Sequence, residues 1–78
     1  EQPAMCLGVP GQIVMLTREG ELVRVGRVSF GGVDQEINLS CVPEAGPGDW
    51  VMVHAGIAIA CIDEEAARRT QQLLADPP

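Results

Sequence analysis

Short apolar runs separated by glycine and proline make up most of the chain before residue 63. Such regular spacing is typical of a small all-β sandwich or barrel. It predicts five strands, over residues 12–17, 22–30, 33–39, 50–55 and 57–62. Closing the sheet would remove strand edges that so short a chain could not cover. We therefore expect a mainly β fold, a small five-stranded OB-like or SH3-like barrel.

Alternation of apolar and polar positions assigns the two faces of the third and fourth strands. The apolar face is predicted to carry Val33, Ile37 and Leu39 in the third strand and Val51, Val53 and Ala55 in the fourth. Gln35 interrupts the apolar face of the third strand. His54 falls on the face opposite the aliphatic residues. Between the two strands, residues 42–49 are too rich in proline and glycine to form an element.

The pattern changes to a helical one at Asp63, which is a capping residue followed by two acids. It predicts a helix over residues 63–76 that packs on a barrel formed by residues 5–62, with residues 1–4 as an extension. The expected apolar stripe consists of Ala66, Thr70, Leu73 and Leu74. Two i,i+4 ion pairs, Glu64 with Arg68 and Glu65 with Arg69, are expected on the solvent side.

Charge and composition narrow the classes of partner. The 78 residues carry a formal charge of −6, which disfavours nucleic acid and anionic lipid. No apolar run approaches the roughly 20 residues of a membrane span, and the first residues do not form a secretory signal. A cytoplasmic protein is therefore expected. A chain of this length also cannot enclose a deep active site, so its chemistry should lie at the surface or against a partner.

Three cysteines and one histidine are the residues that could carry chemistry. The odd number of cysteines does not fit a disulfide framework, and the wide spacing of the cysteines and the histidine does not fit a tetrahedral zinc site. Cys41 and Cys61 are predicted to be small core residues. Cys6, before the first strand, is either a buried apolar residue or an accessible thiol that acts as soft metal ligand or nucleophile. His54 is either an ordinary surface imidazole or part of a site with Cys6.

These residues leave several functions open. With one histidine and neither lysine nor tyrosine, a self-contained enzyme is not expected, although a thiol enzyme with Cys6 as nucleophile and His54 as base is one hypothesis. A small OB-like or SH3-like nucleic-acid-binding module is another. The acidic charge and the two aromatic residues, Phe30 and Trp50, disfavour it, because such modules bind through basic grooves and stacking rings.

Three segments together resemble a known family. They are Met5-Cys6-Leu7-Gly8-Val9-Pro10-Gly11, Phe30-Gly31-Gly32-Val33 with Glu36-Ile37-Asn38-Leu39, and Gly48-Asp49-Trp50-Val51-Met52-Val53-His54-Ala55-Gly56-Ile57-Ala58-Ile59. In this order and spacing they resemble the HypC/HupF family of [NiFe]-hydrogenase maturation chaperones. The resemblance runs from Met5 to about Leu74.

The resemblance implies an OB-like barrel with a C-terminal helix that acts as a scaffold and carrier, not as an enzyme. It implies a HypD-type iron–sulfur protein as partner, transient binding of iron as Fe(CN)2CO, and delivery to the hydrogenase large-subunit precursor. Cys6 matches the family's essential iron-ligating cysteine, and His54 a possible second ligand or hydrogen-bond partner. The implied partner-binding residues are Met5, Cys6, Leu7, Gly8, Pro10 and Gly11.

This chain departs from the family at its beginning. In the family the initiator methionine is removed, so the cysteine becomes the first residue. Here residues 1–4 precede Met5. If the working protein retains this extension, Cys6 can still ligate iron through its thiolate but has no free α-amino group to contribute.

Overall fold

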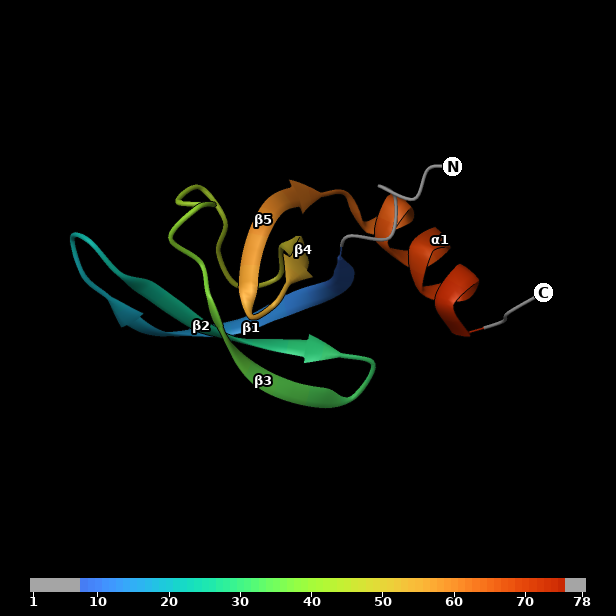
Figure 1. Ribbon diagram of the computed structural model, residues 1–78, viewed down its shortest axis with the longest axis horizontal. Coiled ribbons are helices and arrows are strands. Elements are labelled where there is room, and N and C mark those ends of the chain that lie inside the picture. The colour runs from blue at the N-terminus through green and yellow to red at the C-terminus, as the bar shows by residue number, and fades with distance from the viewer. Residues whose placement is uncertain (1–7, 76–78) are drawn as a thin grey trace.

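The computed structural model of the protein describes residues 8–75, and it is built mainly of strands. Its elements are β1 (Val9–Glu19), β2 (Arg24–Phe30), β3 (Val33–Asn38), β4 (Trp50–His54), β5 (Ile57–Ile62) and α1 (Glu64–Ala75). The strands form a closed barrel in the order β1-β2-β3-β5-β4, and α1 follows β5 at one end (Figure 1). This confirms the predicted five-stranded barrel with a C-terminal helix.

Strand β1 is longer than predicted because it pairs with two neighbours. Its first residues pair antiparallel with β4, and the rest of the strand, from Gln12 onward, pairs with β2. Two register shifts, after Ile13 and after Leu16, interrupt the β1–β2 ladder, and irregularities of this kind bend and twist a strand. The far part of the β1–β2 hairpin reaches beyond the barrel (Figure 1).

The barrel closes through a short parallel contact between β3 and β5. Asn38 and Ile57 are the paired residues. The Asn38 amide also donates a hydrogen bond of 3.0 Å to the carbonyl of Gly56, in the turn between β4 and β5. Because the contact is so short, most of β3 before Asn38 lies along β2 alone.

The core consists of aliphatic side chains from every strand and from the loop before β4. Its buried members are Ile13, Val28, Ile37, Leu39, Val42, Ala45, Val51, Val53 and Ala58. Burial of Ile37, Leu39, Val51 and Val53 confirms most of the predicted apolar faces. Two assignments are wrong. Val33 is 59% exposed at the tip of the β2–β3 hairpin, and Ala55 is exposed because it lies in a turn.

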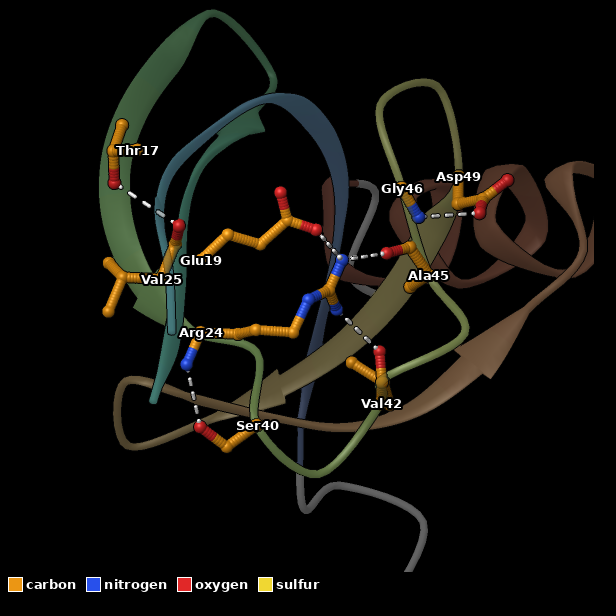
Figure 2. A network of polar contacts seen from close by, with 9 residues as sticks. All are labelled: Thr17, Glu19, Arg24, Val25, Ser40, Val42, Ala45, Gly46 and Asp49. Carbon is orange, nitrogen blue, oxygen red and sulfur yellow. Dashed lines mark hydrogen bonds and ion pairs between the residues drawn. The ribbon is translucent and has the colours of Figure 1, made fainter. Parts of the chain in front are cut away.

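The segment between β3 and β4, predicted only as a loop without an element, contributes to the core through Val42 and Ala45. Arg24, at the start of β2, holds it in place. Its guanidinium donates hydrogen bonds of 3.0 Å to the Val42 carbonyl and 2.8 Å to the Ala45 carbonyl (Figure 2). Its backbone amide donates to Ser40 Oγ, and the side chain is only 14% exposed. Glu19 lies 3.9 Å away as an ion-pair partner.

The prediction that Cys41 and Cys61 are core residues is wrong, because both are exposed. Cys41 lies in the loop after β3, and β5 contributes only Ala58 to the core. When apolar residues occupy successive positions of a strand, as in β5, the sequence does not show which of them face inward. Here the loop residues Val42 and Ala45 are buried instead.

Helix α1 begins as predicted at the Asp63 cap, whose Oδ1 accepts a 2.7 Å hydrogen bond from the Ala66 amide. Of the two expected i,i+4 ion pairs, the one between Glu64 and Arg68 is formed, whereas the structure shows none between the described residues Glu65 and Arg69. The helix packs against β1 and β4. Among its described side chains Ala67 is the buried one, whereas the predicted stripe residues Ala66 and Thr70 are half-buried. The side chains of the other two predicted stripe residues, Leu73 and Leu74, lie outside those that the structure describes. Among residues 8–75, no helix is long and apolar enough to cross a membrane.

Candidate functional site

The pairing of β1 with β4 brings together two segments that the sequence analysis singled out. Val9 pairs with Val53 and Pro10 pairs with Met52 in an antiparallel register. The beginning of β1 therefore lies beside the end of β4, where His54 is located. This region, formed by the start of β1, His54 and the β4–β5 turn, is called here the His54 end of the barrel.

His54 is exposed and occupies a fixed position at the last residue of β4. It pairs with Ile57 across a two-residue turn formed by Ala55 and Gly56. Both turn residues have positive φ, 54° for Ala55 and 83° for Gly56. Positive φ at both central positions is the mark of a type I′ hairpin turn. The imidazole is therefore presented to solvent from a tight turn that is also anchored to β3 through Asn38.

Ala55 is unusual in this turn. Asparagine, aspartate or glycine is preferred at positive φ, since the Cβ of other L-residues approaches the following carbonyl. Within residues 8–75, Ala55 is the one residue other than glycine with positive φ. Such a conformation costs about 1–2 kcal/mol and persists because pairing on both sides of the turn imposes it.

The start of β1 is packed closely into the barrel. Pro10 is fully buried, and Gly11 is buried opposite Val51. A Cβ on Gly11 would lie 2.5 Å from Val28 Cγ1 and 2.7 Å from Phe30 Cε1. The close packing of Pro10 and Gly11 thus fixes the position of the chain directly after the segment that contains Cys6. Their predicted contact with a partner stays a prediction.

A groove of about 280 Å³ lies at the same end of the barrel. Its lining residues are Val9, Phe30, Gln35, Ile37, Val53, Ala55 and Gly56. We refer to it as the turn groove, because the β4–β5 turn forms one of its walls. The lining is uncharged and mainly aliphatic or aromatic, and Gln35 supplies the side-chain polar group. Gln35, which interrupts the apolar pattern of β3, thus has a structural role as a lining residue of this groove.

The predicted residues Met5, Cys6 and Leu7 lie outside the described residues, as does the extension 1–4. Gly8, the first described residue, is half-buried. In residues 8–75, no group of three or more His, Cys, Asp and Glu side chains is arranged to hold a metal ion. The structure therefore gives the position of His54 only, and the pairing of Cys6 with His54 as iron ligands stays a prediction.

The two exposed cysteines differ in environment. The Cys61 thiol donates a hydrogen bond of 3.4 Å to the Glu44 carboxylate. Partial burial, this hydrogen bond and the negative charges of Glu44 and Asp49 all raise the pKa of Cys61. A thiol held in its protonated form is a weak nucleophile and a weak metal ligand, so Cys61 is not a candidate for the chemistry at the His54 end.

Two features of the molecule escaped the sequence analysis. The turn groove joins residues from four strands, and only the exception at Gln35 indicated it. The positive φ of Ala55 leaves no trace in the sequence, because alanine has no preference for that conformation.

Comparison with known proteins gives consistent matches over most of the chain. The sequence model of the HupF/HypC family matches residues 5–74. A hydrogenase maturation factor HypC from Synechocystis is 51% identical over 67 residues, covering 85% of this chain and 88% of that protein. The HypC of Rhodobacter capsulatus is 44% identical, covering 92% of this chain and 77% of that protein. The maturation factor HybG of Escherichia coli K12 is 34% identical, covering 90% and 88%.

Proposed function

This chain belongs to the HupF/HypC family, and we propose that it is a [NiFe]-hydrogenase maturation chaperone that carries iron as Fe(CN)2CO. The relatives named as hydrogenase maturation factors support the maturation role. The iron unit is the cargo of the chaperone, which we propose to be a carrier and not an enzyme.

We propose that the Cys6 thiolate is the main iron ligand contributed by this chain. Cyanide and carbon monoxide are strong-field ligands, and a thiolate is a soft ligand suited to the same iron. Cys6 precedes Gly8 by two residues, so the covalent chain keeps their Cα atoms within about 7 Å. The β1–β4 pairing brings Gly8 to the His54 end of the barrel, which supports the location of iron binding there.

The observation that carries this proposal is the position of His54. An exposed imidazole on a rigid turn, beside the strand that the Cys6 segment leads into, can serve as second ligand or as hydrogen-bond donor to an iron-bound group. One thiolate and one imidazole cannot complete the coordination of iron. A HypD-type protein would supply further groups, and few ligands from the carrier would ease transfer to the large-subunit precursor.

The test is anaerobic co-purification of the full chain with its HypD-type partner, followed by infrared spectroscopy of the cyanide and carbonyl stretches. The bands are expected with the unaltered chain and lost with Cys6→Ala. Cys41→Ala is the matched control, since Cys41 is an exposed thiol in the loop after β3 and outside the segment that leads into β1, and it should retain both partner and bands. His54→Ala is expected to shift or weaken the bands while leaving the fold intact, because the side chain is exposed.

Two results would contradict the proposal. The first is a Cys6→Ala chain that still yields the complex with normal bands. The second is the absence of cyanide and carbonyl bands from the unaltered complex isolated from cells that mature their hydrogenase.

A further inference from the structure

The turn groove is an open apolar site whose natural occupant can be argued from the strand that borders it. Its volume of about 280 Å³ is below the usual range for an organic ligand or cofactor. It suits one or two aliphatic side chains. Because its lining residues carry no charge, it favours an uncharged apolar group over an ionic one.

Alternation along β1 shows which residues face this groove. Val9 lines the groove with its side chain 47% exposed, and Gly11 and Ile13, further along the same face, are buried. Side chains at odd positions of this part of β1 therefore point toward the groove and the core. Pro10 points to the opposite face, which it shares with its cross-strand partner Met52 and, two residues on, with His54.

We propose that the side chain of Leu7 from this same chain docks in the turn groove. Leu7 precedes Val9 by two residues, so in an extended course it would continue the groove-facing row. The segment Met5–Leu7 carries no charge and has an apolar residue on either side of Cys6. The described chain begins at Gly8, beside the groove, so the segment reaches it without crossing another element.

The same alternation gives this docking a consequence for Cys6. With Leu7 directed into the groove, the neighbouring Cys6 points to the opposite face of the strand. That is the face on which His54 lies at the end of β4. The groove would thereby orient the thiol toward the imidazole. This consequence rests on the proposed iron-carrying function, whereas the docking of Leu7 itself does not.

The test is methyl NMR of the full chain with labelled Leu, Val and Ile methyl groups, recorded without iron or partner. Nuclear Overhauser effects are expected between the Leu7 methyls and those of Val9, Ile37 and Val53. Leu7→Ala should remove these cross-peaks and shift the groove methyls, since the smaller side chain lowers the docked population on the order of tenfold. Leu22→Ala is the matched control, because Leu22 is 90% exposed on the β1–β2 hairpin, and it should leave the groove methyls unchanged.

Two results would overturn the docking. One is a set of Leu7 methyls that resonate like those of exposed Leu22 and give no cross-peaks to the groove. The other is a groove whose methyls shift only when a HypD-type protein is added, which would assign it to a side chain of the partner. Since no iron is used, either failure leaves the carrier proposal standing. Missing infrared bands would, conversely, leave the docking untouched.

Discussion

Arg24 is expected to be the most sensitive polar residue of the barrel, and replacing it with methionine tests this. Methionine keeps an unbranched apolar stem but removes the guanidinium. The change deletes the hydrogen bonds of 3.0 Å to the Val42 carbonyl and 2.8 Å to the Ala45 carbonyl. Both carbonyls belong to residues whose side chains are buried in the core. The loop before β4 would thus lose the side chain that holds it against the barrel (Figure 2).

The expected loss of stability follows from these contacts. A hydrogen bond from a charged donor contributes about 1.5–3 kcal/mol, so two give about 3 kcal/mol at the lower limit. The ion pair with Glu19 adds little, because its atoms are 3.9 Å apart and the Glu19 side chain is 64% exposed. A domain of this length is stable by about 4–12 kcal/mol. Arg24→Met should therefore remove a quarter or more of the free energy of unfolding.

Urea unfolding followed by circular dichroism measures this loss. With a slope of about 1 kcal/mol per molar urea, the midpoint should fall by roughly 3 M. Arg27→Met is the matched control on the same strand, since Arg27 is exposed opposite Glu36, and it should change stability by about 0.5 kcal/mol or less. Equal midpoints for the two variants would refute the assignment of Arg24 as the residue that fixes the loop.

Three further changes test other parts of the structure. Ala55→Gly should raise the free energy of unfolding by about 0.5–1 kcal/mol in urea titration, because glycine adopts the positive φ of the turn without strain; a loss would contradict the turn geometry. Gly11→Ala should cost about 1–3 kcal/mol by overpacking, whereas Gly46→Ala, with open space around it, should be nearly neutral; the same titration compares the two. Because burial and the Glu44 carboxylate raise the pKa of the Cys61 thiol, this thiol should be alkylated more slowly than that of Cys41 at pH 8, as peptide mass spectrometry can show. As the pH rises, the Cys61 thiol of the unfolded chain loses its proton before that of the folded chain, because its pKa is the lower of the two. The stability that the protonated Cys61 thiol contributes is therefore present at neutral pH and is lost as the pH rises through the raised pKa.

Much of the barrel follows from local patterns along the chain. The apolar run over residues 57–62 predicts the fifth strand where the structure has it, and the helix begins at the predicted cap. Gly31 and Gly32 form the two-residue turn between β2 and β3, and their φ values of 63° and 100° are positive, as a type I′ hairpin turn requires. These features depend on neighbouring residues only, because strand alternation, capping and turn geometry are set within a few positions.

The errors concern residues whose burial depends on distant parts of the chain. Cys41 and Cys61 lie in apolar or strand-end contexts, yet both are exposed. Val42 and Ala45 come from a segment without regular structure, yet both are buried. For Cys41, Val42 and Ala45, exposure or burial is decided by where the loop before β4 crosses the barrel, and Arg24 holds that loop from another strand. No local pattern in the sequence records such a contact.

By itself, the sequence determined the class of fold through its strand pattern. It also determined the residues that can carry chemistry, since Cys6 in its short motif and the single histidine leave few choices. Only the tertiary structure decided that the start of β1 lies beside His54, that the turn is strained at Ala55, and that a groove opens next to both. The turn at Ala55 is held by the pairing of His54 with Ile57 and by the Asn38–Gly56 hydrogen bond, whereas the other two features depend on pairing between residues more than forty positions apart, as between Val9 and Val53. Such pairing follows from closure of the whole barrel.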